Sequence, residues 1–247
     1  MTNSAISAKD LTKKFGDFIA VNHITFDVAE SEIFGFLGAN GAGKTTAMRM
    51  LCGLLNPTSG EGSVAGFDIY RETQKIKKNI GYMSQKFSLY NDLTVLENMR
   101  LFGGIYGMND SQIRARTDYW LRELSLQAEQ NVLTQSLPLG IKQKVAFAVA
   151  TFHNPKIVFL DEPTGGVDPI ARRTFWELIY QASEQGITVF VTTHYMDEAE
   201  YCHRISIMVD GRIEALDTPQ NLRKQFEAKN MDEVFHQLAR KAKRTDN

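Results

Sequence analysis

The chain has 247 residues, with 28 lysines and arginines against 29 aspartates and glutamates, a formal net charge of −1, and 43% hydrophobic residues. This composition excludes a disordered or collagen-like chain, and the length suffices for one large domain or two small ones with a real core. A net charge near zero gives no general attraction to nucleic acid or anionic membrane. Cys52 and Cys202 are too few for a disulfide framework, which indicates a reducing compartment such as the cytosol.

No segment has the composition of a membrane span or of an export signal. The longest uninterrupted apolar stretch, Val145 to Ala150, has six residues, whereas a span needs about 18 or more. Residues 1–14 lack the apolar centre of a signal peptide. We therefore expect the chain itself neither to cross a bilayer nor to be exported.

The first third is predicted to form short strands, and the middle is predicted to form helices. The sequence predicts short strands broken by turns at residues 5–11, 19–28 and 33–37, with the alternation of apolar and polar residues clearest over residues 23–28. We expect these strands to form an antiparallel layer. Apolar residues then recur every three or four positions over residues 93–106 and 111–126, the spacing of amphipathic helices. We interpret this middle part as a helical insert within one domain, because no internal repeat or linker rich in proline or glycine is visible.

The second half alternates between helices and apolar strands, which is typical of a parallel sheet. Near its end, Asp210-Gly211 separates two further strands and favours a type I′ hairpin turn. A basic helical tail follows. The elements expected here are a helix at 141–152, a strand at 157–160, a helix at 171–183, a strand at 187–191 and hairpin strands at 205–209 and 212–216.

Residues 38–45, Gly-Ala-Asn-Gly-Ala-Gly-Lys-Thr, match the phosphate-loop pattern G-x-x-x-x-G-K-[ST] in full. A predicted strand precedes them and a helical segment at 46–55 follows, which is the context that the motif requires. The glycines let successive N–H groups point at phosphate oxygens, Lys44 adds a positive charge at the β and γ phosphates, and the Thr45 hydroxyl is offered to Mg²⁺. The predicted nucleotide-binding residues of this loop are Gly38, Asn40, Gly41, Ala42, Gly43, Lys44, Thr45 and Thr46.

Residues 156–163, Lys-Ile-Val-Phe-Leu-Asp-Glu-Pro, predict a buried strand that ends in two acids. Ligand chemistry in parallel sheets gathers at the C-terminal ends of the strands. Since adjacent residues on a strand point in opposite directions, Asp161 can face the Mg²⁺ on the phosphate loop while Glu162 reaches the water that attacks the γ phosphate. Without the phosphate loop, two solvated acids at a strand end would be the simpler interpretation.

In this order, the motifs resemble the nucleotide-binding domain of ABC (ATP-binding cassette) transporters, from about residue 7 to residue 235. The resemblance implies that Gln85 is the Q-loop glutamine, which contacts Mg²⁺ and the attacking water, and that His194 is the switch histidine, which contacts the γ phosphate. It also places Asp168 at the D-loop position of the family's dimer interface. By chemistry alone, a lone glutamine or histidine is more often structural, and Asp168 before Pro169 also suits a helix N-cap.

The resemblance implies a complete set of ATP and Mg²⁺ contacts. Its catalytic residues are Glu162, His194, Gln85 and Lys44, and its metal ligands are Thr45, Gln85 and Asp161. Phe15 falls where the family carries the aromatic residue that stacks on adenine. Phe18 is close enough in sequence to take this role instead, and a core phenylalanine is the remaining alternative for Phe15.

The family's signature sequence, Leu-Ser-Gly-Gly-Gln, is altered in this chain. The aligned stretch Leu137-Pro138-Leu139-Gly140-Ile141 keeps only Leu137 and Gly140. In the family, the serine hydroxyl and glycine amides of one subunit bind the γ phosphate held by the other, but Pro138 has neither a hydroxyl nor an N–H and Leu139 adds a side chain. One such contact is worth about 2–4 kcal/mol in comparable sites. The Gly140 amide and the helix dipole still face the anion, so Gly140 stays among the expected ATP-binding residues.

The resemblance implies an α/β fold of the P-loop NTPase class, with a RecA-like parallel core sheet, an N-terminal antiparallel β subdomain and an α-helical subdomain insert. We expect a single ATP-binding domain over residues 1–247. Within it, the helical subdomain should cover about 87–145, and the C-terminal hairpin and helical tail about 204–247.

The implied function is that of an ATPase subunit of a membrane exporter, resembling the ABC-2 type drug and antibiotic export branch. Such a subunit works with separate transmembrane subunits, for which residues 86–96 would form the groove, and dimerises head to tail with itself or with a second ABC ATPase. We expect it in the cytoplasm, peripheral on the inner face of the cell membrane, with no nucleic-acid partner. A soluble non-transport ABC ATPase is the alternative, and a GTPase is less compatible because no Asn-Lys-x-Asp motif occurs.

Overall fold

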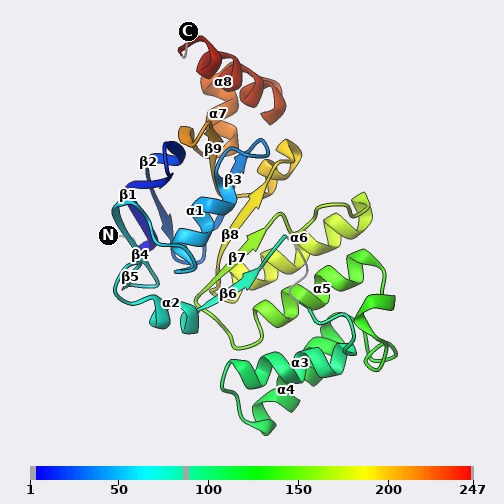
Figure 1. Cartoon of the computed structure of the whole chain (residues 1–247). Helices are drawn as coiled ribbons and strands as arrows, with labels where there is room; N and C mark the ends of the chain where they lie inside the picture. The colour runs from blue at the N-terminus through cyan, green and yellow to red at the C-terminus, as the bar shows by residue number, and fades with distance from the viewer. Residues whose placement is uncertain (1–3, 86–88, 246–247) are drawn as a thin grey trace.

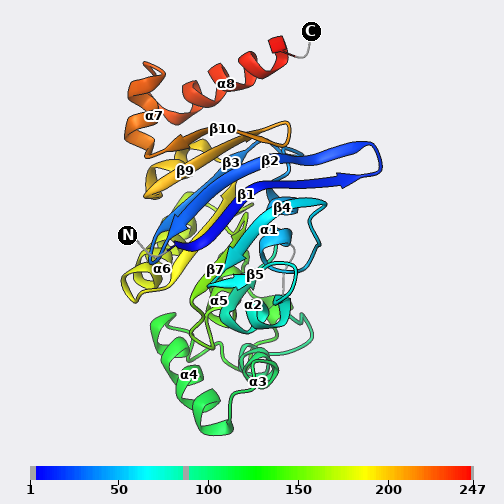
Figure 2. The ribbon, with the colours of Figure 1, turned by 90° about the vertical axis from the view of Figure 1, so that its left-hand side faces the viewer.

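The structure, a computed structural model, describes residues 4–85 and 89–245. These residues form a six-stranded sheet at the centre and a four-stranded sheet beside it, with helices packed around both (Figures 1 and 2). The helices from the middle of the chain lie at one end of the molecule and the C-terminal helices at the other. The α/β class predicted from the sequence, with its parallel core sheet, antiparallel subdomain and helical insert, is confirmed.

The smaller sheet is antiparallel, with strand order β2-β1-β4-β5. Its long strands, β1 (Ser4–Phe15) and β2 (Phe18–Ala29), form a hairpin within the predicted antiparallel layer, and both strands are longer than expected. The short strands β4 (Ser59–Val64) and β5 (Phe67–Asp68) were not predicted. Their residues, rich in serine and glycine, give little alternation of apolar and polar side chains.

The third predicted strand belongs to the other sheet. We expected residues 33–37 in the antiparallel layer, but β3 (Ile33–Gly38) pairs in parallel with β8 (Thr188–Thr193) and β9 (Arg204–Val209). This expectation was wrong. All the residues of β3 are buried, as is typical of a strand covered on both faces, and a short apolar run does not reveal from sequence alone which sheet it joins.

The six-stranded sheet has the order β10-β9-β3-β8-β7-β6 and is parallel except where β10 returns beside β9. Successive side chains of β3 divide between its two faces. Phe34 and Phe36 join the apolar cluster shared with the antiparallel sheet, whereas Ile33 and Leu37 join the cluster under the helices of the other side. The other strands of this sheet are β6 (Ile80–Met83), β7 (Ile157–Asp161) and β10 (Arg212–Asp217).

Helix α1 (Lys44–Leu51) starts within the phosphate loop and ends earlier than the predicted residue 55. Gly53 adopts a φ of +65° just after the helix. Its N–H donates to the carbonyl of Met50, and the N–H of Leu54 donates to the carbonyl of Arg49. This pair of hydrogen bonds is the Schellman arrangement, which terminates a helix, so Gly53 sets its end.

The helical subdomain contains α3 (Val95–Ile105) and α4 (Asp110–Glu123), followed by η1 (Thr134–Ser136) and α5 (Leu139–Ala150). The predicted helices agree with α3, α4 and α5 to within a few residues at each end. Both α3 and α4 begin with a capping box, in which a side chain before the helix and one in its first turn exchange hydrogen bonds with the backbone. Residues 87 and 88, where this subdomain was expected to begin, lie outside the described residues.

The C-terminal end of α5 anchors this subdomain to the central sheet. Arg116 of α4 donates from Nε to the carbonyl of Phe152 at 2.9 Å. Next to it, His153 Nε2 lies 3.1 Å from the carbonyl of Ile80, and the His153 ring stacks on Tyr106 with centroids 3.8 Å apart. Burial lowers the pKa of His153 to about 4, so this junction holds a neutral imidazole at neutral pH.

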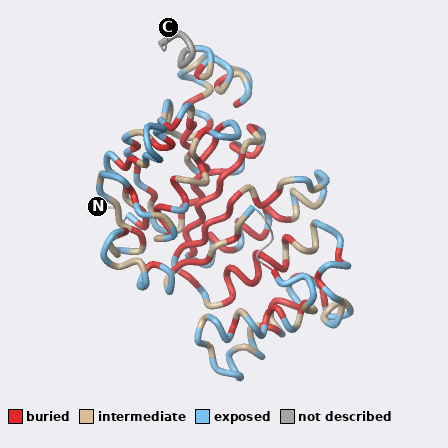
Figure 3. The backbone as a smooth tube through the Cα atoms, in the orientation of Figure 1, coloured by how far each residue is buried: buried red, intermediate tan, exposed pale blue. Residues whose placement is uncertain are grey.

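The last part of the chain contains the predicted hairpin, the short helix α7 and the longer helix α8. Asp210 and Gly211 have φ angles of +46° and +79°, as a type I′ turn requires, so this prediction is confirmed. Buried residues concentrate in the central strands, whereas the outer helices carry exposed faces (Figure 3). Within the described part of the chain, no helix is long and apolar enough to cross a membrane. The remaining helices are α2 (Thr73–Asn79), α6 (Pro169–Glu184), η2 (Met196–Tyr201), α7 (Pro219–Gln225) and α8 (Met231–Thr245).

Candidate functional site

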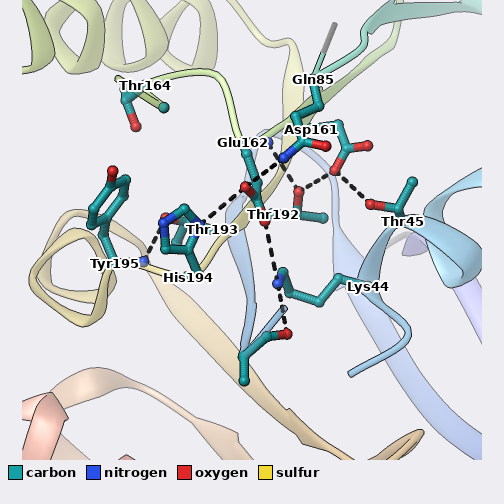
Figure 4. Close-up of polar contacts among 12 residues, drawn as sticks. Lys44, Thr45, Gln85, Asp161, Glu162, Thr164, Thr192, Thr193, His194 and Tyr195 are labelled. Atoms are coloured by element: carbon teal, nitrogen blue, oxygen red, sulfur yellow. Dashed lines mark hydrogen bonds and ion pairs between the residues drawn. The ribbon is translucent and has the colours of Figure 1, made fainter. Parts of the chain in front are cut away.

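The candidate site lies at the C-terminal ends of the parallel strands, where β3, β7 and β8 bring side chains to one place (Figure 4). A cavity of about 270 Å³ opens there beside the phosphate loop. All of its lining residues except Phe18 and Ala20 were predicted as site residues. The lining consists of Phe18, Ala20, Asn40, Gly41, Gly43, Lys44, Thr45, Thr46, Gln85 and Glu162.

Close packing behind the phosphate loop explains its glycines. Gly43 has a φ of +102°, and a Cβ there would lie 2.3 Å from the carbonyl oxygen of Ala20. A Cβ on Gly38 would lie 2.5 Å from the carbonyl oxygen of Met208. Gly38 and the buried Ala42 therefore shape the loop from behind and are not among the residues that line the cavity.

The Lys44 side chain is held inside the loop, with only 4% of the residue exposed. Its Nζ donates to the carbonyls of Gly38 at 2.8 Å and Ala39 at 3.1 Å and lies 3.4 Å from Glu162 Oε1. Burial lowers the pKa of Lys44, and the Glu162 carboxylate partly opposes that shift. The acid thus offsets part of the cost of burying the ammonium group.

Asp161 is buried at the end of β7, where its carboxylate meets the first turn of α1. Its Oδ1 accepts hydrogen bonds from Thr45 Oγ1 at 3.1 Å and from Thr192 Oγ1 at 2.6 Å. A hydroxyl and a carboxylate side by side are hard oxygen ligands of the kind that Mg²⁺ prefers. The residues present therefore fit the predicted ion, with Thr45 and Asp161 already adjacent.

Glu162 is the residue on which the predicted catalytic side chains converge (Figure 4). Its Oε2 accepts a hydrogen bond from Gln85 Nε2 at 2.9 Å and lies 3.0 Å from His194 Nδ1. Its Oε1 faces the Lys44 ammonium. The amide nitrogen of Gln85 thus points at the acid, and the four predicted catalytic residues form one hydrogen-bonded group.

A turn at Glu162 separates the two acids. We expected strand alternation to point them in opposite directions, but β7 ends at Asp161 and Glu162 adopts a φ of +48°, which is uncommon for a residue other than glycine. The Glu162 N–H donates to both the carbonyl and the hydroxyl of Thr192, each at 3.1 Å. These hydrogen bonds stabilise the turn. As a result, the Glu162 side chain points toward Lys44, Gln85 and His194, whereas Asp161 contacts Thr45.

The two aromatic candidates for adenine stacking sit at the tip of the β1–β2 hairpin, where Phe15 pairs with Phe18. Their exposed fractions are 50% for Phe15 and 65% for Phe18. Phe18 lines the cavity and Phe15 does not, while the Nζ of Lys13 lies 5.1 Å from the centroid of the Phe15 ring. The assignment of adenine stacking to Phe15 therefore stays a prediction, with Phe18 as its alternative.

Comparison with known proteins agrees with this geometry. The sequence profile described as ABC transporter matches residues 21–165, more than half of the chain. The chain belongs to the ABC transporter family. Among solved structures, an ATP-binding subunit of an ABC transporter superposes with a TM-score of 0.85 and 28% sequence identity, covering 95% of this chain and 99% of that one. An ABC cassette solved as a dimer with ADP and Pi superposes with a TM-score of 0.77 and 29% identity, covering 86% and 98%.

Curated relatives in the ABC family include export proteins. The probable multidrug ABC transporter ATP-binding protein YbhF of Escherichia coli is 49% identical over 222 residues, which are 90% of this chain but 38% of that protein. The chain therefore spans well under half of that relative's length. The Nod factor export ATP-binding protein I of Paraburkholderia xenovorans is 36% identical over 223 residues, 90% of this chain and 73% of that protein.

The altered ABC signature lies at the start of α5, with Pro138 at the N-cap and no side-chain hydrogen bond to the first turn. A Cβ on Gly140 would lie 2.9 Å from the Cβ of Ala171, so this glycine permits close packing of α5 on α6. Leu139 lines a separate cavity of about 190 Å³ that also includes Gln85 and Glu162. The phosphate-loop cavity of the same chain does not include Gly140 in its lining.

Asp168, the aspartate that the resemblance places at the D-loop position, caps α6. Asp168 accepts hydrogen bonds from the N–H groups of Ile170 and Ala171, both at 3.0 Å. These backbone hydrogen bonds, that of Ala171 first, lower the pKa of the Asp168 carboxyl. The N-cap role considered from the sequence is therefore confirmed, and it is compatible with a position at a dimer interface.

Sequence reasoning missed two residues of this ABC site. Thr192 holds both the Asp161 carboxylate and the Glu162 backbone, yet in the sequence it is one of three threonines in its strand. Gln143 donates to the carbonyl of Gly165 at 3.2 Å and ties the signature helix to the loop after the two acids. Both residues are buried polar groups that need a partner. Thr192 stands beside Thr193 and Gln143 stands between two lysines, so the sequence gives no signal for either.

Proposed function

We propose that this chain is the ATP-hydrolysing subunit of an ABC-type membrane exporter, which powers transport through separate transmembrane subunits by ATP-driven dimerisation. The observation that carries this proposal is the convergence of Lys44, Gln85 and His194 on the two carboxylate oxygens of Glu162. An acid held in this way beside a phosphate loop is suited to orient and polarise an attacking water.

In the proposed reaction, the phosphate loop and Lys44 bind the β and γ phosphates of ATP, and Lys44 exchanges its contact with Glu162 for phosphate oxygens. Glu162 then accepts the water's hydrogen bond, while Gln85 and His194 orient the carboxylate and the γ phosphate. Thr45, Asp161 and Gln85 would hold Mg²⁺, which supplies charge neutralisation at the β and γ phosphates. Asp161 keeps its place through the Thr192 hydroxyl.

Dimerisation is part of the proposal because Gly140 of the signature helix does not line the chain's own phosphate-loop cavity. In a head-to-tail dimer, the N-terminal turn of α5 with Gly140 would face the γ phosphate bound by the other subunit. Asp168 at the start of α6 would lie at the same interface. The second subunit is a further copy of this chain or another ABC ATPase.

Export is supported by the names of the relatives, which include a Nod factor export ATP-binding protein. A peripheral position on the inner face of the cell membrane is part of the same proposal. The groove for a transmembrane subunit is proposed at residues 86–96, of which 86–88 lie outside the described residues. Within the described part of this segment, Tyr90 is 51% exposed, and on the neighbouring α3 Ile105 is 61% exposed. Exposed apolar side chains of this kind suit a protein contact.

The test measures the mass of purified Glu162→Gln protein by light scattering, with and without Mg-ATP, beside the ATPase rate of the unchanged protein. Loss of the acid should leave ATP bound and trap a closed dimer, so we expect the mass to double with Mg-ATP. Glu177→Gln, an exposed glutamate on α6, is the matched control and should not trap a dimer. A Glu162→Gln protein that binds ATP and stays monomeric would contradict self-pairing and point to a second ABC ATPase.

A further inference from the structure

Glu198 is a buried acid that the proposed reaction does not use. It lies in η2, four residues after His194, and is 0% exposed. Its Oε2 has no hydrogen-bond partner among the residues that the structure describes. Burying a carboxylate is costly unless charged or polar groups compensate for the lost water, so its remaining contacts should explain why an acid stands here.

The other carboxylate oxygen joins two segments. Glu198 Oε1 accepts a hydrogen bond from Thr164 Oγ1 and lies 3.6 Å from Arg172 Nε. Thr164 belongs to the loop that follows Glu162, and Arg172 lies in the first turn of α6, which Asp168 caps. A single buried oxygen thus connects the loop after the catalytic acid with the helix after the D-loop.

Arg172 extends this connection to the switch histidine. Its guanidinium carbon lies 4.3 Å from the centroid of the Tyr195 ring, and that ring lies 4.2 Å from the His194 ring, centroid to centroid. Arg172 Nη1 also lies 3.2 Å from Asp197 Oδ2 at the start of η2. The guanidinium is therefore held between the segment that carries His194 and the buried Glu198.

We propose that Glu198 is a positioning residue for the ATPase site, which fastens the loop after Glu162, the start of α6 and the turn that bears His194 into one unit. This inference rests on the proposed function. Thr164, Arg172 and Tyr195 transmit the position of α6 to His194, so the D-loop and the switch histidine move together. Glu198 itself touches neither Glu162 nor the phosphate-loop cavity.

The test substitutes Glu198→Gln, which keeps the shape and removes the charge that holds Arg172. We expect kcat for ATP hydrolysis to fall between about tenfold and a hundredfold, because a small misplacement of a catalytic group costs this much. The KM for Mg-ATP should stay unchanged, since Lys44 and the phosphate loop are not touched. Glu200→Gln is the matched control: Glu200 lies in the same η2 segment, is exposed, and pairs with Arg223 at 3.3 Å.

A second comparison separates positioning from general damage to the fold. In a His194→Ala background, Glu198→Gln should cause little further loss of kcat, because its effect passes through His194. Equal losses in both backgrounds, or a Glu198→Gln enzyme as fast as Glu200→Gln, would overturn the proposal. If Glu198→Gln does not fold, as judged by circular dichroism, Arg172→Gln tests the same link from the more exposed side and should give the same loss of kcat and the same dependence on His194.

The unchanged protein and Glu162→Gln are measured in the same assay. No hydrolysis by an unchanged protein that dimerises with Mg-ATP would overturn the proposed function and the positioning role together. Hydrolysis that Glu162→Gln abolishes and Glu198→Gln leaves intact would retain the proposed function and remove only the role of Glu198.

Discussion

Two regions of this molecule differ in how many of their expected contacts one chain provides. The phosphate-loop side comprises residues 38–46 with Gln85, Asp161, Glu162 and His194, and the signature side comprises residues 137–141 at the start of α5. On the first side, Lys44, Asp161, Glu162 and His194 already contact one another or a shared threonine within one chain. On the second side, the start of α5 offers a helix N-terminus without a side-chain cap. The comparison teaches that the fold itself assembles the predicted catalytic group, whereas in the proposed dimer the signature helix would receive its ligand from the second subunit.

The two sides also differ in how their polar groups are satisfied. Asp161 is buried and the Glu162 side chain is 9% exposed. The two acids receive hydroxyl and ammonium donors from β8 and α1 and an amide donor from Gln85, which follows β6. At the signature side, Gly140 serves close packing on Ala171, and Leu139 keeps 36% of its surface exposed. Substitutions on the first side should therefore act within one chain, while substitutions on the second side should act through the dimer.

The largest expected effects come from substitutions on the phosphate-loop side. Glu162→Gln should lower kcat by about 10²–10⁴, the usual contribution of a general base, while the affinity for ATP is retained. Lys44→Ala should instead weaken ATP binding itself, because it removes a charge from the phosphates. Isothermal titration calorimetry with ATP measures the affinity and a steady-state phosphate-release assay measures kcat, so the two results can be told apart. Full ATP affinity in Lys44→Ala would contradict the assignment of the phosphate loop.

The next effect tests the second side. Pro138→Ser combined with Leu139→Gly restores the hydroxyl and the close backbone approach of the family signature. If the altered sequence limits turnover, kcat should rise at least about tenfold, because one such contact stabilises the transition state by about 2–4 kcal/mol. Lys144→Gln, on the same helix and away from its first turn, is the control and should not change the rate. An unchanged rate in the double variant would show that the altered signature does not limit hydrolysis.

Sequence patterns predicted the phosphate-loop side better than the signature side, for a physical reason. The phosphate loop needs glycines at fixed spacing around one lysine, so residues 38–45 carry their geometry in the residue types themselves. Glu162 was also found from the sequence, but its left-handed backbone and its hydrogen bonds from Gln85 and His194 depend on residues far away in the chain. The roles of Gln85 and His194 came only from resemblance to the family.

Other features could not be predicted because tertiary contacts decide them. The sheet to which β3 belongs is set by its parallel pairing with β8 and β9, which lie far along the chain. In the sequence Thr192 is an ordinary strand residue, and only the folded chain brings its hydroxyl to Asp161. The buried acid Glu198 lies in a polar stretch of sequence, and nothing there indicates that Arg172 and Thr164 pack against it.

A smaller effect concerns the far end of the signature helix, where α5 is anchored to the central sheet. The pKa of His153 is lowered to about 4 in the fold, against about 6.5 in an unfolded chain. Between these values the unfolded state binds more protons, so stability falls as pH falls. From pH 7.5 to pH 5, His153 should account for a loss of up to about 2 kcal/mol in the free energy of unfolding.

Urea unfolding of the unchanged protein and of His153→Gln at pH 7.5 and pH 5 measures this loss. The variant should lose less stability than the unchanged protein over this range, because glutamine does not titrate. His236→Gln, in the C-terminal helix α8 away from this junction, is the matched control and should keep the pH dependence of the unchanged protein. Identical pH dependence in His153→Gln would contradict a neutral, buried imidazole at this anchor.

The smallest effect lies at the rim of the phosphate-loop side, where the hairpin tip meets the cavity. Resemblance to the ABC family assigns adenine stacking to Phe15, whereas Phe18 lines the cavity. We expect Phe15→Ala to weaken ATP binding about fivefold, the equivalent of about 1 kcal/mol for an aromatic stacking contact. Phe18→Ala is its matched comparison, and both variants should keep their affinity for inorganic triphosphate, which has no base to stack. If Phe18→Ala weakens ATP binding and Phe15→Ala does not, the base stacks on the ring that lines the cavity, and the assignment to Phe15 is wrong.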